Sequence, residues 1–138
     1  MGEEGAGQPM SAVDTNVLIR VIITDTPAQT EAARAKLEEG VFVSHGILME
    51  SEWVLRSVYR LDRDQIGSAL RTLVTQDAVD VVDEDSILWA LDRYLEGADF
   101  ADMLHLVSAT DSGPFLTFDQ DLARFAGAAA PVAVELLK

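Results

Sequence analysis

Several aspartate side chains fall at positions from which their carboxylates could act together. Asp14 directly follows a short apolar segment, and Asp119 follows another, with Asp121 two residues later. Asp99 and Asp102 are three residues apart, so they would share one face at the start of a helix. Carboxylate oxygens grouped in this way bind hard divalent cations such as Mg²⁺ or Mn²⁺. One or two such ions could orient an attacking water and neutralise charge on a phosphodiester.

Two glutamates of one predicted helix are expected to behave differently. Glu50 is followed at i+4 and i+8 by Val54 and Val58, which places it on an apolar face. An acid on such a face is costly to bury unless a cation or a proton compensates its charge. Glu52 has Arg56 four residues later, and this spacing predicts an ordinary surface ion pair. The sequence therefore favours Glu50 as the functional acid of this helix.

Helix capping is the alternative explanation for the aspartates. Asp14, Asp99 and Asp119 each precede a predicted helix, and an aspartate N-cap contributes about 1 kcal/mol to stability. Asp102 and Asp121 would lie in first turns, where a negative charge complements the positive end of the helix dipole. Capping accounts for each residue singly, but it does not explain why several acids should gather at one edge of a sheet.

The elements that must position these acids alternate between strands and helices. The predicted strands span residues 10–13, 41–44, 79–82, 114–118 and 131–134, with the first of them buried. The predicted helices span residues 17–23, 27–39, 47–59, 66–74, 87–95, 99–110 and 121–125. Thr26 with Gln29 and Asp62 with Gln65 match the capping-box pattern at two helix starts.

Short apolar strands separated by helices predict an α/β domain with a largely parallel sheet covered on both faces. Ligands of such sheets bind beyond the carboxyl ends of the strands. Asp14 and Asp119 both follow predicted strands directly, so the same edge of the sheet is the expected site.

Length and charge limit the possibilities further. The chain has 138 residues and is read as a polar, glycine-rich leader over 1–9 followed by a single domain over 10–138. It has no cysteine, which excludes disulfides, thiolate zinc sites and Fe–S clusters. Its 24 acidic and 10 basic residues give a net charge of −14, which disfavours passive binding of nucleic acid. Bound divalent cations would reverse that charge locally.

No apolar run reaches the roughly 18 residues of a membrane span. The first nine residues also lack the signature of a secretory signal. The expectation is a cytoplasmic protein with no membrane association.

Four segments of the chain resemble, in order and spacing, the motifs of the PIN-domain ribonucleases, particularly toxins of the VapC type. They are residues 13–20 (VDTNVLIR), 48–55 (LMESEWVL), 99–106 (DFADMLHL) and 116–122 (LTFDQDL). A single DTN would be weak evidence, whereas four ordered motifs are strong evidence. The resemblance covers almost the whole chain, from residue 10 to about residue 134.

The resemblance implies a parallel five-stranded sheet between helices, with a Mg²⁺ or Mn²⁺ pocket formed by catalytic acids. These acids are Asp14, Glu50, Asp102 and Asp119. Asp99 and Asp121 become secondary acids, either behind the metal ligands or at a second metal. Thr15, Asn16 and Thr117 fall where the family orients its carboxylates or its water.

The resemblance also implies the reaction and the partners. The expected activity is endonucleolytic hydrolysis of RNA at a structured tRNA or rRNA loop. In-line attack by water would leave a 5′-phosphate and a 3′-hydroxyl. Such toxins are usually homodimers, and a small VapB-like antitoxin inhibits them by inserting into the active-site groove.

Two other functions are weighed against this one. An aspartyl phosphatase or phosphotransferase would need a second aspartate two residues after the nucleophile, where this chain has Asn16. Its only lysines, Lys36 and Lys138, also lie outside the central region. A catalytically idle PIN-like interaction module would be expected to have lost one or more acids, and all four are present.

Other side chains have weaker interpretations. Arg20, Arg56, Arg60 and Arg63 could line one groove for RNA, or could simply offset nearby acids. The aromatic residues Phe42, Trp53 and Trp89 are expected in the core or a dimer interface. His105, one turn after Asp102, is expected to be packed or hydrogen-bonded.

Overall fold

The computed structural model describes residues 10–138, so the predicted leader over 1–9 lies outside the described residues. The helices are α2 (Thr15–Ile22), α3 (Pro27–Glu39), α4 (His45–Ser57), α5 (Arg63–Val74), α6 (Glu84–Leu95), α7 (Phe100–Ser108) and α8 (Gln120–Ala126). The strands are β1 (Ser11–Ala12), β2 (Val41–Phe42), β3 (Val79–Asp80), β4 (Phe115–Thr117) and β5 (Val134–Leu136). Among these helices, none is both long enough and apolar enough to cross a membrane.

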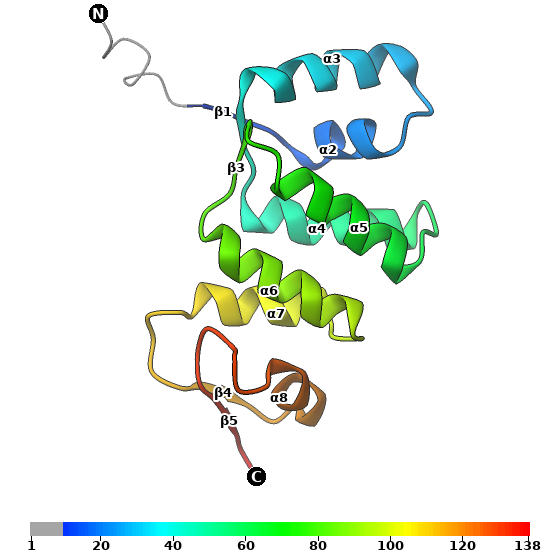
Figure 1. Ribbon diagram of the computed structural model, residues 1–138. Coiled ribbons are helices and arrows are strands. Elements are labelled where there is room, and N and C mark those ends of the chain that lie inside the picture. The colour runs from blue at the N-terminus through cyan, green and yellow to red at the C-terminus, as the bar shows by residue number, and fades with distance from the viewer. Residues whose placement is uncertain (1–9) are drawn as a thin grey trace, which may run out of the picture.

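The α/β class and the parallel pairing are as the sequence predicts, but the five-stranded sheet is wrong. The described strands form a three-stranded sheet in the order β1-β2-β3 and a separate pair, β4-β5. Every pairing is parallel. Figure 1 shows β1 with α2 and α3 at one end of the molecule and β4, β5 and α8 at the other. The helices α4 to α7 lie between these two ends.

The strands are too short to hold one continuous sheet, because each contributes only two or three residues to pairing. Most of the core is helical, and the strands themselves contribute only Val41 and Val79 to the buried residues of the described chain. Buried leucines of the central helices fill the core: Leu48, Leu55, Leu70, Leu91 and Leu104. Packing between helices therefore fixes the fold, while the sheet stays divided.

The first strand differs from its prediction in burial. Ser11 and Ala12 are exposed, because β1 is an edge strand that pairs only with β2. The last strand is also displaced, since β5 covers Val134–Leu136 and not residues 131–134. Both differences concern strands whose other edge has no partner among residues 10–138.

One of the two predicted capping boxes is present. At the start of α5, the Asp62 carboxylate accepts from the Gln65 amide at 2.8 Å, and the Gln65 side chain accepts from the Asp62 amide at 2.9 Å. Thr26 precedes α3 but makes no capping bond. Its hydroxyl instead accepts a hydrogen bond from Arg20 at 2.9 Å. A contact from the preceding helix thus takes the side chain that the capping pattern assigned to the start of α3.

Candidate active site

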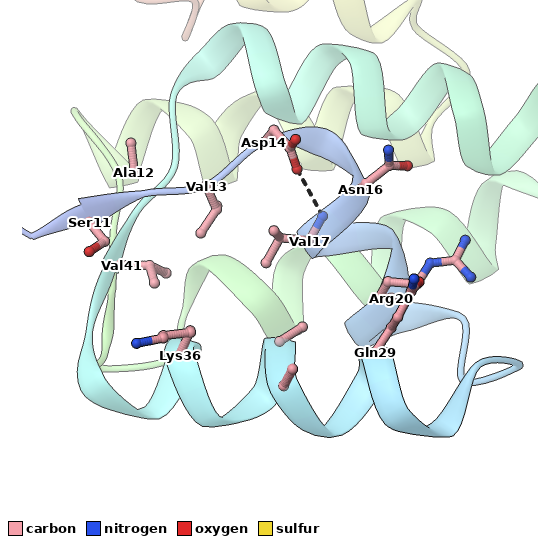
Figure 2. A pocket seen from close by; sticks show the side chains of 12 residues that line it. Ser11, Ala12, Val13, Asp14, Asn16, Val17, Arg20, Gln29, Lys36 and Val41 are labelled. Atoms are coloured by element: carbon pink, nitrogen blue, oxygen red, sulfur yellow. Dashed lines mark hydrogen bonds between the residues drawn. The ribbon is translucent and has the colours of Figure 1, made fainter.

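The first motif places Asp14 at the junction between β1 and α2. Its Oδ1 accepts a hydrogen bond from the Val17 amide at 3.1 Å, as Figure 2 shows, so Asp14 is the N-cap of α2. The next residue, Thr15, donates from Oγ1 to Oε1 of Glu50 at 2.5 Å. This bond spans 35 positions of sequence and joins the first motif to the second. We call Glu50, its donor Thr15 and the preceding residue Asp14 the Glu50 cluster.

In the third and fourth motifs, the aspartates cap the helices that follow them. Asp99 is the N-cap of α7, and its Oδ1 accepts from the Asp102 amide at 2.9 Å. Asp119 is the N-cap of α8 and accepts from the amides of Asp121 at 2.9 Å and Leu122 at 3.1 Å. The predicted capping roles of the three aspartates are therefore confirmed. Each cap engages one oxygen, Oδ1, so capping and metal binding are compatible.

The surroundings of Asp102 disfavour the ionisation of its carboxyl group. Its pKa is raised, first by partial burial and then by the negative charges of Asp99 and Asp119. The nearby His105 opposes this rise. We call Asp99, Asp102 and Asp119 the Asp102 cluster. Carboxylates brought close enough to disfavour one another's charge fit a hard cation, whose charge would reverse the penalty.

The acids of the two clusters are not preassembled around a metal position in the part of the chain that the structure describes. Within residues 10–138, no group of three or more histidine, aspartate or glutamate side chains is placed to hold a metal ion together. β1 leads towards Asp14 and β4 leads towards Asp119, and these two strands lie in separate sheets. The donor set fits Mg²⁺ or Mn²⁺ in its chemistry, but among residues 10–138 no three of its side chains are placed together around an ion.

The remaining residues of the expected site have separate roles. Thr117 accepts on its hydroxyl from the Asp119 amide at 2.9 Å, which fixes the backbone just before α8. The carboxylate of Asp121 pairs with Arg124 at 2.9 Å, so it is held by a neighbour on its own helix. Asn16 is exposed and lines a groove beside Asp14.

That groove has a volume of about 850 Å³ and opens between β1, α2 and α3. Figure 2 shows Asp14, Asn16 and Arg20 on one side of it and Gln29 and Lys36 on the other. Of the four expected catalytic acids, only Asp14 lines it. The groove therefore adjoins the Glu50 cluster without joining it to the Asp102 cluster.

The expected contrast between Glu50 and Glu52 is wrong. Glu50 is exposed, whereas Glu52 is only 6% exposed and is the one charged side chain that is buried within residues 10–138. Leu48 and Leu55 lie on the buried face at i−4 and i+3 from Glu52, and that spacing is the signal that could have revealed its burial. Arg56 does pair with Glu52, at 2.7 Å, but the pair is not an ordinary surface pair.

Three of the four arginines that could line a groove for RNA are held by contacts within the fold, and the fourth, Arg60, is exposed. Arg20 pairs with Asp25 at 3.0 Å and donates to the Tyr59 hydroxyl at 2.6 Å. Arg63 donates to two backbone carbonyls, and Arg56 is held by Glu52. These guanidiniums therefore serve the fold. The interpretation that they offset acids and pack locally is the better one.

Three further expectations concern single side chains. Trp53 is 54% exposed, so a core position for it is wrong, while Phe42 and Trp89 are half-buried. His105 is exposed and has no hydrogen-bond partner among the described residues, so the packed histidine is also wrong. Its position one turn after Asp102 leaves it facing solvent beside the Asp102 cluster.

Comparison with protein families gives the class of the molecule. The model of the PIN domain matches residues 12–128, which is most of the chain, so this protein belongs to the PIN domain family. PIN domains are generally nucleases that act on RNA. No curated protein and no solved structure matches the chain.

Proposed function

We propose that this PIN-domain protein is a metal-dependent endoribonuclease and the toxin of a VapBC-like toxin–antitoxin pair. The observation that carries the proposal is the Asp102 cluster, where partial burial and then the charges of acids from two separate motifs raise the pKa of Asp102. Such an arrangement is costly without a compensating cation. In a family of nucleases, a cation bound by these acids would act on the phosphodiester of the RNA.

The residues divide into ligands and positioning groups. Asp14, Glu50, Asp102 and Asp119 would hold Mg²⁺ or Mn²⁺, with Asp99 and Asp121 as secondary acids. When bound, the cation would supply an activated water and neutralise charge on the phosphodiester. Thr15 holds the Glu50 carboxylate, and Thr117 holds the amide of Asp119. Asn16 lies beside Asp14 and is proposed to orient the substrate or the water.

The proposed substrate is a structured loop of tRNA or rRNA, cut to leave a 5′-phosphate and a 3′-hydroxyl. The proposed partners are a second copy of the chain and a small VapB-like antitoxin. We place the enzyme in the cytoplasm, as one PIN domain over 10–138 preceded by a short leader.

The test is cleavage of a panel of total RNA, tRNA and rRNA by the purified protein. The reactions contain Mg²⁺, Mn²⁺ or EDTA, and Asp102→Asn is run beside the wild type. We expect discrete fragments with 5′-phosphates that disappear with EDTA and with the variant. Absence of cleavage with either metal, from protein shown to be free of antitoxin, would refute the proposal.

A second candidate is an interaction module with the PIN fold but no catalysis. The observation that favours it is that no three acids within residues 10–138, those of the Asp102 cluster included, are placed to hold a metal ion together. The two functions differ in metal binding. The module predicts no heat of Mn²⁺ binding in calorimetry, whereas the nuclease predicts binding that Asp102→Asn abolishes.

A further inference from the structure

A buried polar network connects the helix of Glu50 to the helix of Asp102. Its centre is Glu52 on α4, whose Oε2 accepts from Nε of Arg56 at 2.7 Å and from the Tyr94 hydroxyl at 3.0 Å. Both Glu52 and Tyr94 are almost fully buried, at 6% and 2% exposure. Burial of the phenol and the negative charge of Glu52 raise the pKa of Tyr94, so its hydroxyl stays a proton donor.

Tyr94 lies near the end of α6, where α5 also contacts it. The guanidinium of Arg63, at the start of α5, lies 4.5 Å from the centre of the Tyr94 ring. Arg63 also donates to the carbonyls of Tyr94 at 2.7 Å and Ala98 at 2.6 Å. The ring of Phe100 meets Tyr94 edge-on at 5.5 Å between centroids. The turn between α6 and α7 is thus fixed from α4, α5 and α7 at once.

The turn between α6 and α7 is followed directly by two acids of the Asp102 cluster. Ala98 is followed by Asp99, the N-cap of α7, and Asp102 lies in the first turn of that helix. On the other side of the network, Glu50 precedes Glu52 by two residues, so the two side chains point in different directions from α4. Glu50 reaches Thr15, while Glu52 reaches Tyr94. Helix α4 therefore carries both Glu50, a proposed metal ligand, and Glu52, which binds the tyrosine before the Asp102 cluster.

We propose that Glu52 and Tyr94 are positioning residues that set the placement of Asp99 and Asp102 relative to Glu50. The proposal rests on the proposed function, because the placement matters only if the acids share a site. Neither residue touches the substrate. A buried carboxylate and its hydrogen-bond donors form a rigid link, since losing one partner leaves the others unsatisfied.

The test compares the two tyrosines of the chain. Tyr94→Phe removes one hydroxyl and keeps the ring that contacts Arg63 and Phe100. Tyr59→Phe is the matched control, because its hydroxyl accepts from Arg20 at 2.6 Å and takes no part in the network of Glu52 and Tyr94. For each variant, Mn²⁺ affinity is measured by calorimetry without RNA, kcat and KM are measured on the cleaved RNA, and unfolding is followed thermally.

We expect Tyr94→Phe to weaken Mn²⁺ binding and lower kcat by about tenfold, the range seen when groups behind metal ligands are removed. The KM for RNA should stay the same, and Tyr59→Phe should change none of these values. Glu52→Gln supplies a second variant. The double variant of Glu52→Gln with Tyr94→Phe should lose little more than the stronger single variant, because both act through one contact.

The outcomes separate this proposal from the proposed function. A wild type that cleaves RNA, together with a Tyr94→Phe variant that keeps wild-type kcat and Mn²⁺ affinity, would overturn the positioning role alone. A wild type that neither binds Mn²⁺ nor cleaves RNA would overturn both. Equal losses of thermal stability in the two tyrosine variants, with no difference in metal affinity, would show that the network is merely structural.

Discussion

Asp102 lies where burial and two neighbouring negative charges act against its ionisation. Its raised pKa means that the folded chain holds this proton more tightly than the unfolded chain. The resulting stabilisation is fully present below the unfolded pKa of about 3.9 and is lost as pH rises through the folded pKa. At neutral pH the ionised carboxylate therefore weakens the fold unless a cation is bound.

This gives a prediction for Asp102→Asn. Relative to wild type without metal, the variant should gain stability as pH rises from about 4 towards 7. Thermal unfolding in EDTA across that range measures the difference. Cleavage should fall by more than the roughly 100-fold typical of groups behind a ligand. Asp111→Asn, an exposed aspartate in the turn after α7, should show neither effect, and a stability difference independent of pH would contradict the account.

Thr15 offers a test of the Glu50 cluster that leaves every acid in place. Thr15→Val removes the hydroxyl that donates to Glu50, so the carboxylate becomes free to rotate. Mn²⁺ affinity and kcat should each fall about tenfold. Thr75→Val makes the same exchange at the end of α5, where the hydroxyl donates to the backbone carbonyls of Arg71 and Thr72. If both variants keep wild-type metal affinity in calorimetry, Thr15 has no part in the site.

At the level of elements, Asp14 at the start of α2 and Asp119 at the start of α8 are each a cap and a proposed metal ligand, and the two roles can be separated at Asp119. Asparagine caps a helix about as well as aspartate, whereas alanine costs about 1 kcal/mol. Asp119→Asn should therefore abolish cleavage with little change in thermal unfolding. Asp119→Ala should abolish cleavage and also destabilise the protein. Wild-type cleavage by Asp119→Asn would show that the aspartate is only a cap.

The helices could be predicted from the sequence because their signals are local. The Asp62 and Gln65 box is complete within four residues, and the apolar period marks each buried helix face. The capping box at Thr26 failed because Arg20, six residues away, takes the hydroxyl. The single five-stranded sheet was wrong for a related reason. Strand pairing depends on long-range packing, and two-residue strands carry little periodicity of their own.

For the candidate site, sequence spacing predicted which acids follow strands and start helices. The structure pairs Thr15 with Glu50 and groups Asp99, Asp102 and Asp119, although their role in metal binding stays a prediction. Glu52 and Tyr94 were missed because their contact spans 42 positions. The i+4 arginine also made Glu52 resemble a surface pair, although its neighbours on the helix face are buried leucines.

At the scale of the whole molecule, the charge of −14 limits how RNA can be held. Six of the ten basic side chains are in ion pairs: Arg20, Lys36, Arg56, Arg71, Arg93 and Arg124. Few are left to neutralise phosphates directly, so binding should depend on divalent cations far more than on counterion release.

Raising NaCl from about 50 to 200 mM at fixed Mg²⁺ should therefore weaken RNA binding by less than about tenfold, against 10³–10⁵ for proteins with many phosphate contacts. Fluorescence anisotropy of labelled RNA measures this salt dependence. The Asp111→Asn protein, which changes one exposed charge, is the control and should show the same dependence. Strong binding in EDTA with a steep salt dependence would place the RNA on a basic surface and contradict the account.

The central claim is that the Glu50 and Asp102 clusters serve one metal site. It is tested most directly by Mn²⁺ titration calorimetry, without RNA, on wild type and on Asp14→Asn, Glu50→Gln, Asp102→Asn and Asp119→Asn. The account predicts that wild type binds Mn²⁺ and that each of the four substitutions weakens binding by at least about tenfold. Binding that survives Asp14→Asn and Glu50→Gln but not Asp102→Asn would mean that the clusters act separately, and no binding by wild type would contradict the metal site altogether.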